Sequence, residues 1–163
     1  MELYFRPLAW ADALAVARWR YPAPYQLYDL ARGQMLGSVA IHRVTAPLRR
    51  IGFYAVASHD DPLIGVFSFR KLGYALEIGL GLRPDLTGQH HGLAFVRAGL
   101  AFGRATYAPI SFRLDVATFN QRAIRVYERA GFVAGRSFTR YTRLGAYEFI
   151  EMTRPAHDPT AAP

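Results

Sequence analysis

Apolar and polar positions form a regular pattern in the middle of the chain. Two apolar runs, residues 53–57 and 63–69, flank the turn formers of residues 58–62, and this order predicts a β-hairpin. A further apolar run at residues 74–82 predicts the next strand. The pattern then changes to a helical period over residues 92–106, followed by a strand at residues 112–116.

The last third of the chain continues this alternation. Apolar side chains recur near helical spacing over residues 120–130, and Gly131 stands where a helix ends. Two strands, at about residues 132–141 and 147–153, complete the pattern. A hairpin followed by strand, helix, strand, helix and strand predicts a mixed sheet with helices on its faces.

The first fifty residues are less regular. They predict a short strand at residues 3–5, a helix from about Asp12 to Trp19, and a loop around Pro22 and Pro24, which cannot continue a helix. A short helix at residues 25–33 is expected next. Residues 35–50 have weak periodicity, and only residues 39–42 suggest a brief strand.

Length and composition limit the number of domains and the class of protein. The 163 residues, 52% of them apolar, fit one domain over residues 1–154, and the Pro- and Ala-rich residues 155–163 predict a disordered tail. No apolar run reaches the length of a membrane span, and the start has no signal-peptide pattern. With no cysteine, thiol nucleophiles and thiolate metal sites are excluded. We expect a cytoplasmic protein.

The net charge of +8 is suited to an anionic partner, which is nucleic acid, an acidic surface or a polyphosphate cofactor. The arginines are spread along the chain rather than gathered in a basic tail. This distribution favours a solvated surface over a nucleic-acid site.

The segment 86–94, Leu-Thr-Gly-Gln-His-His-Gly-Leu-Ala, joins the strand at 74–82 to the helix at 92–106. A glycine-bearing loop before a helix can direct several backbone N–H groups at one point, and the helix dipole adds positive potential there. The segment therefore predicts a phosphate or pyrophosphate site.

Residues 76–132 carry a family resemblance. The strand Glu-Ile-Gly-Leu-Gly-Leu-Arg-Pro at 77–84, the glycine loop, and Asn-x-x-Ala-x-x-x-Tyr-x-x-x-Gly-Phe at 120–132 resemble the acetyl-CoA-binding core of the GNAT superfamily of N-acetyltransferases. The resemblance implies an α+β fold with a twisted mixed sheet of about six to seven strands and about four helices. It also implies acetyl-CoA as co-substrate and an amine as acceptor.

The resemblance implies a cofactor site as well. In it, the backbone of Leu80, Gly81 and Leu82 pairs with the pantetheine arm. The expected contacts to the rest of the cofactor are Thr87, Gly88, Gln89, His90, His91, Gly92, Leu93, Ala94, Asn120, Ala123 and Tyr127.

The loop departs from the family pattern Gln/Arg-x-x-Gly-x-Gly/Ala. The ungapped alignment places Thr87 first and His90 at the central glycine, whereas sliding by two residues starts the match at Gln89. We prefer the ungapped alignment. A Cβ at His90 is tolerable at negative φ and costly otherwise, and the imidazole itself is a candidate phosphate contact.

Glu77 and Tyr127 are the candidate catalytic residues. Glu77 shares a strand face with Gly79 and Gly81, which leave space beside it, and it is a general-base candidate; the alternative is an ion pair with an arginine. Tyr127 matches the family tyrosine that protonates the departing CoA thiolate, and its alternative role is core packing. Asn120 is also a helix-capping candidate.

Aromatic residues around the two prolines are candidates for the acceptor-binding wall, with core packing as the alternative: Trp19, Tyr21, Tyr25 and Tyr28. His90 and His91 with Asp85 make a poor metal site, because adjacent residues rarely converge on one ion. Arg122, Arg125 and Arg129 fall at helical spacing and favour a solvated face over phosphate contacts.

The sequence therefore predicts an acetyl-CoA-dependent N-acetyltransferase in which a primary amine attacks the thioester directly. The alternatives are a non-catalytic acyl-CoA-binding or sensing module and, more remotely, a basic nucleic-acid-binding protein. The acceptor amine is not specified by any motif, and a homodimer is possible because sheet edges often pair.

Overall fold

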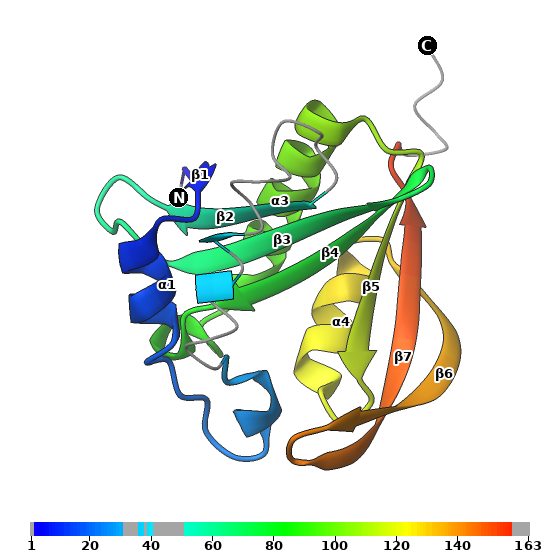
Figure 1. Cartoon of the computed structure of the whole chain (residues 1–163). Helices are drawn as coiled ribbons and strands as arrows, with labels where there is room; N and C mark the ends of the chain where they lie inside the picture. The colour runs from blue at the N-terminus through cyan, green and yellow to red at the C-terminus, as the bar shows by residue number, and fades with distance from the viewer. Residues whose placement is uncertain (1, 31–35, 38, 41–50, 158–163) are drawn as a thin grey trace. The chain divides into compact units, whose positions relative to one another are not determined.

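The computed structural model describes residues 2–30, 36–37, 39–40 and 51–157. Its strands form one seven-stranded sheet in the order β1-β2-β3-β4-β5-β7-β6. The elements, drawn in Figure 1, are β1 (Tyr4–Pro7), α1 (Trp10–Val16), the 3-10 helix η1 (Tyr25–Tyr28), β2 (Ile51–Ala57), β3 (Gly65–Leu72), β4 (Ala75–Leu82), the 3-10 helix η3 (Pro84–Leu86), α3 (Gly92–Tyr107), β5 (Ser111–Ala117), α4 (Gln121–Arg129), β6 (Val133–Thr142) and β7 (Gly145–Pro155).

The sheet is mixed, as expected. β1 with β2, β2 with β3, β5 with β7 and β6 with β7 pair antiparallel, whereas β4 and β5 pair parallel. The parallel register runs from Ala75 opposite Ser111 to Glu77 opposite Arg113. This arrangement confirms the predicted α+β class and the predicted hairpin of β2 and β3.

The chain divides into two compact units, one formed by Met1–Arg70 with Gly79–His91 and the other by Lys71–Ile78 with Gly92–Pro163. The first unit has an aliphatic core in which α1 packs against β2 and β3. Its buried members are Leu8, Ala13, Val16, Ala17, Val39, Ala55 and Val66. The start of α1 is fixed by Asp12, whose carboxylate accepts the Ala9 N–H at 2.9 Å and pairs with Arg6.

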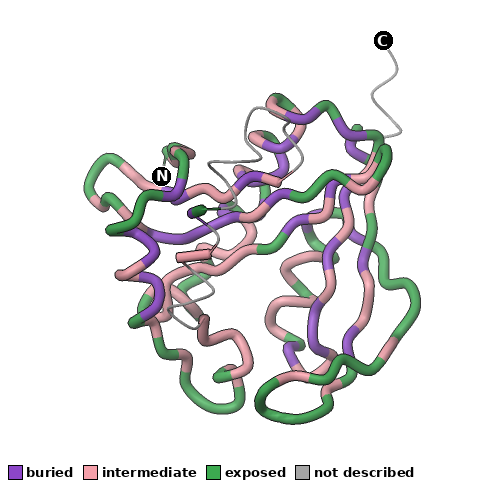
Figure 2. The backbone as a smooth tube through the Cα atoms, in the orientation of Figure 1, coloured by how far each residue is buried: buried purple, intermediate pink, exposed green. Residues whose placement is uncertain are grey.

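The second unit is built on alternation along β5. Phe112, Leu114 and Val116 are fully buried, while Arg113 and Asp115 point to the other face of the strand. The helices α3 and α4 contact one another, and a Cβ at Gly92 would lie 3.3 Å from Val126 of α4. Figure 2 shows the resulting alternation of buried and half-buried positions along β5.

Several sequence expectations differ from the structure in detail. The helix expected at residues 25–33 is the single 3-10 turn η1, and residues 31–33 lie outside the described residues. Val39 and Ala40, where a brief strand was expected, are helical, while residues 41 and 42 are not described. Pro155 ends β7, and Ala156 is buried with its N–H bonded to the Ile110 carbonyl. The expected tail is thus ordered at its start, and residues 158–163 lie outside the description.

Candidate active site

Glu77 lies on β4 beside an arginine of the neighbouring strand. Its Oε2 atom is 3.4 Å from Nε of Arg113, which stands opposite it in the parallel register, and the Glu77 side chain is 20% exposed. The ion pair expected as the alternative role of Glu77 is therefore present. Part of the Glu77 carboxylate nevertheless stays accessible to solvent.

The far end of β4 carries two glycines, Gly79 and Gly81, which stand two and four residues after Glu77. A Cβ at Gly79 would lie 2.5 Å from Oγ of Ser68, and one at Gly81 would lie 3.4 Å from the Tyr21 hydroxyl. Tyr21 donates a hydrogen bond of 2.8 Å to the Leu82 carbonyl. The space that these glycines leave in the first unit is therefore used by Ser68 and Tyr21.

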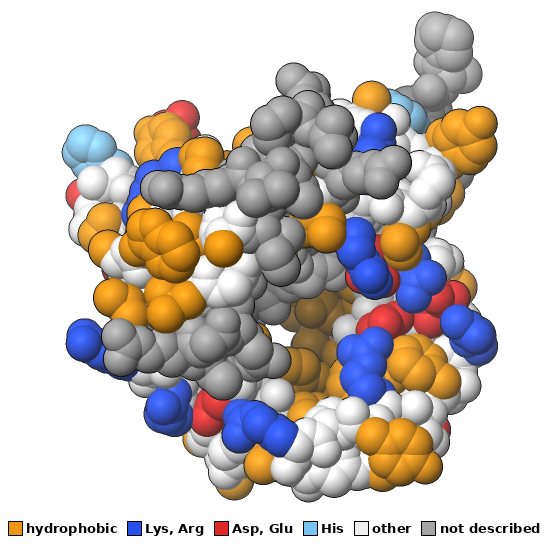
Figure 3. Space-filling model, in the orientation of Figure 1, with side chains coloured by type: hydrophobic (Ala, Val, Ile, Leu, Met, Phe, Trp, Pro, Cys, Tyr) orange, Lys and Arg blue, Asp and Glu red, His pale blue; other side chains and the backbone are white. Residues whose placement is uncertain are grey.

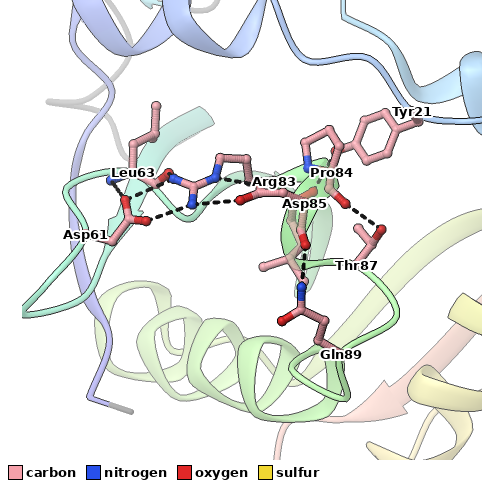
Figure 4. A network of polar contacts seen from close by, with 9 residues as sticks. Tyr21, Asp61, Leu63, Arg83, Pro84, Asp85, Thr87 and Gln89 are labelled. Carbon is pink, nitrogen blue, oxygen red and sulfur yellow. Dashed lines mark hydrogen bonds and ion pairs between the residues drawn. The ribbon is translucent and has the colours of Figure 1, made fainter.

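A clamp centred on Arg83 holds the chain where it leaves β4 (Figure 4). Arg83 forms ion pairs of 2.8 Å with Asp61 and 2.7 Å with Asp85 and also donates to the Leu63 carbonyl at 3.0 Å. Hydrogen bonds from the Arg83 guanidinium hold the pKa of both aspartates below the usual range. The clamp joins the turn before β3 to the start of the predicted phosphate loop.

Side chains also bond within the loop itself. Thr87 donates from its hydroxyl to the Pro84 carbonyl at 2.7 Å, and Gln89 donates from its amide to the Asp85 carbonyl at 2.6 Å (Figure 4). Both side chains therefore stabilise the loop conformation through hydrogen bonds to its backbone. Leu93 and Ala94 form the first turn of α3, which begins at Gly92 as predicted.

Two loop residues have left-handed backbone conformations, Gly88 with φ of 80° and His90 with φ of 62°. The φ of His90 is therefore positive, which is the costly case for a residue with a Cβ. The left-handed conformation lowers the stability of the folded chain by about 1 kcal/mol for such a residue. His91 is not among the positive-φ residues. A loop that alternates ordinary and left-handed residues turns successive N–H groups toward a common centre.

The start of α4 carries the second part of the expected cofactor site. Asn120 is buried and accepts the Ala123 N–H on Oδ1 at 3.2 Å, which is the predicted capping role. Tyr127 is half-buried, and its ring packs edge-on against Phe132 with centroids 6.0 Å apart. Gly131 follows the helix with φ of 89°, as its position predicted.

The four aromatic candidates for the acceptor wall have different surroundings. Trp19 packs against the core of the first unit, which is its alternative role. Tyr25 and Tyr28 are half-buried at the two ends of η1. Tyr21 donates a hydrogen bond to Leu82, which lies on the expected pantetheine strand.

Sequence reasoning missed the Arg83 clamp. Asp61 is one of the turn formers of residues 58–62, and its carboxylate accepts hydrogen bonds from Arg83 and from the Leu63 N–H at 3.1 Å. The signal in the sequence was an arginine directly after the strand, with Asp85 two positions later. Its other partner, Asp61, is 22 residues away along the chain, so only the fold brings it close.

In the described part of the chain, no cluster of three or more potential metal ligands is present. Nor does any helix there have the length and apolar character needed to cross a bilayer.

Comparison with known structures identifies the fold. A chimera of the Vibrio cholerae spermidine N-acetyltransferase SpeG and hSSAT superposes with a TM-score of 0.79 at 15% identity, covering 96% of each chain. SpeG from Vibrio cholerae in complex with CoA and spermine gives 0.74 at 16% identity, covering 94% of this chain and 95% of that one. A search of curated protein sequences finds no match.

The family follows from the sequence profile of the acetyltransferase (GNAT) domain, which matches residues 2–133, well over half of the chain. The profile includes the strand, loop and helix motifs described above. The chain therefore belongs to the GNAT family of acetyltransferases, with acetyl-CoA as its co-substrate and an amine as its acceptor.

Proposed function

We propose that the loop from Thr87 to Gly92 binds the CoA diphosphate through its backbone N–H groups, with Leu93 and Ala94 in the helical turn behind it. The observation that carries this proposal is the pair of left-handed residues, Gly88 and His90, directly before the start of α3. The backbone of Leu80, Gly81 and Leu82 binds the pantetheine arm. Asn120 and Ala123, which are joined by the cap of α4, are further proposed cofactor contacts.

Glu77 accepts a proton from the acceptor amine, directly or through a water molecule, in this mechanism. The neutral amine then attacks the thioester carbonyl, the C–N bond forms, and the C–S bond breaks. As the amide forms, the nitrogen loses its second proton, which restores the phenol of Tyr127 after that residue has protonated the thiolate. Tyr127 donates its phenolic proton to the departing thiolate. The support is the partial exposure of Glu77 at 20% and the position of Tyr127 in the Asn-Ala-Tyr-Gly-Phe motif.

Tyr21 contributes to the acceptor side in this proposal, together with Tyr25, Tyr28 and the edge of Trp19. Its hydroxyl bonds to Leu82 at the end of the proposed pantetheine strand. A bulky aromatic at that point limits the size of the amine that reaches the thioester.

Replacing Tyr127 by Phe tests the proposal most directly. We expect a fall in kcat of roughly 10²-fold with little change in CoA affinity, because general acid catalysis contributes about that factor. The measurement is thiol release from acetyl-CoA with an amine panel, alongside CoA binding by thermal shift.

Tyr74→Phe serves as the matched control, since Tyr74 is 81% exposed. Unchanged kcat in Tyr127→Phe would remove the assigned role. CoA binding without thiol release for any amine would instead favour a sensing module.

A homodimer and a cytoplasmic location also belong to this proposal. β6 ends the strand order, and almost all of its residues are exposed, so its edge is open to pairing. The cysteine-free sequence offers no disulfide framework suited to an oxidising compartment. Sedimentation analysis and cell fractionation test these two points.

A further inference from the structure

One face of the sheet in the second unit carries six charged side chains, which we call the charged sheet face: Glu77, Arg113, Asp115, Arg136, Arg140 and Glu151. Arg113 lies at its centre. Its guanidinium is 3.4 Å from Glu77, 3.6 Å from Asp115 and 3.0 Å from Glu151. Figure 3 shows acidic and basic side chains interleaved over this part of the surface.

The outer rim of this face is cationic. Arg140 bonds to Asp115 at 2.6 Å, and its guanidinium lies 4.4 Å from the ring centroid of Phe149. The arginine is therefore held by an ion pair and a cation–π contact together. Arg136 approaches Glu151 at 4.0 Å and is 74% exposed, whereas the three carboxylates are 12–20% exposed.

All three carboxylates of the face are already paired with arginine. A polyamine is recognised by carboxylates that are free to pair with its ammonium groups. Where the carboxylates are already paired with arginine, an ammonium group meets the like charge of the guanidinium, which is unfavourable. A polyamine brings further ammonium groups besides the reacting amine at Glu77, and each of these would have to displace a guanidinium from Asp115 or Glu151. The chain as a whole carries a charge of +8. This face is therefore a poor polycation site.

We propose that the acceptor is an amine that carries a carboxylate, such as an amino acid or a peptide N-terminus, and that polyamines are poor acceptors. The proposal rests on the role proposed above for Glu77. The carboxylate of the acceptor meets the cationic rim of Arg136 and Arg140, while its amine approaches Glu77. Three consecutive contacts, through Arg113 and Asp115, link Glu77 to Arg140 and keep the two ends of the site on one surface.

Matched amines test this specificity. Glycylglycine, its C-terminal amide and spermidine are compared by thiol release from acetyl-CoA and by thermal shift in the presence of CoA. We expect kcat/KM for glycylglycine to exceed that for the amide at least tenfold, with spermidine the weakest. Equal values for the dipeptide and its amide, or a preference for spermidine, would overturn the proposal.

Removing the cationic rim is the second test. In the double variant Arg136→Gln/Arg140→Gln, the preference for the carboxylate should fall at least fivefold, and spermidine binding should strengthen. The control Lys71→Gln/Arg97→Gln makes the same change in net charge at exposed positions of the same unit. An equal effect in both variants would assign the preference to net charge and not to this face.

Failure of the enzyme proposal has a different signature. Absence of a thermal shift with CoA would contradict the CoA site itself. CoA-dependent thiol release with spermidine as the best acceptor would leave the enzyme proposal intact and overturn this inference.

If Arg140→Gln disturbs folding, Arg136→Gln alone carries the test, because Arg136 is the most exposed arginine of the face. If no amine releases thiol, the thermal shifts of the three amines with CoA still rank them.

Discussion

His90 adds backbone strain to the loop that we propose as the diphosphate site. It has φ of 62° and is exposed, and the ungapped alignment places it where the family pattern has glycine. The imidazole therefore gains little from burial, while the backbone bears the cost of the left-handed conformation. The strained residue therefore lies within the loop that we propose as the diphosphate site.

Replacing His90 by Gly should raise the free energy of unfolding by about 1 kcal/mol, since glycine adopts positive φ without steric cost. Urea denaturation measures the change. His91→Gly is the matched control, because His91 is not among the positive-φ residues, and it should give no stabilisation. A loss of stability in His90→Gly would show that the imidazole makes a favourable contribution that exceeds the strain.

At the scale of elements, the end of β4 and the phosphate loop behave as one supported segment. Arg83 ties it to Asp61, Tyr21 ties it to the 21–29 segment, and Thr87 and Gln89 bond back to η3. Tyr21 itself is fixed by its own N–H, which donates to Asp29 at 2.9 Å. In the proposed diphosphate site, such support would lower the entropy that the loop loses on binding.

The Arg83 clamp predicts an acid-sensitive contribution to stability. The pKa of Asp61 and Asp85 is lowered in the folded chain by hydrogen bonds from Arg83. The stabilisation is therefore present above the ordinary aspartate pKa of about 4 and is lost as the pH falls through the lowered values. Urea unfolding from about pH 6 down to about pH 3 should show a steeper loss for the natural chain than for Arg83→Gln.

The comparison of slopes isolates the clamp, because every other carboxylate is common to both proteins. Parallel pH profiles would mean that the two ion pairs add nothing measurable at this exposed site. Arg83→Gln should also weaken CoA binding, since the loop loses its anchor.

At the scale of the whole molecule, the positive charge has a kinetic consequence. A chain of net charge +8 attracts an anionic cofactor over distances of about the Debye length, roughly 10 Å at 0.1 M salt. The same field disfavours a polycationic acceptor. The net charge therefore favours the anionic co-substrate and disfavours a polyamine acceptor.

The association rate of CoA should fall as salt rises from low concentration to about 0.3 M, with a smaller change in the dissociation rate. Stopped-flow fluorescence of a labelled CoA gives both rates. The association rate of a labelled DNA duplex, measured at equal phosphate concentration, is the control for non-specific attraction. An association rate independent of salt would show that long-range steering is absent.

Much of this protein was readable from its sequence. Local patterns determined the β2–β3 hairpin, β4, α3, β5 and α4, because hydrophobic period and helix-ending residues such as Gly131 act over a few neighbouring positions. The motif at residues 120–132 identified the family for the same reason. The irregular first fifty residues, in contrast, carried no strong local signal, and their elements were placed less well.

Tertiary structure decided what depends on residues far apart in the chain. It paired Arg83 with Asp61, laid Tyr21 on the end of β4, and gave each carboxylate of the charged sheet face an arginine. It also set the sign of φ at His90, which no side-chain pattern specifies. Sequence determines which local conformations are favourable, but charge compensation is a property of distances in space, and those exist only once the strands have paired.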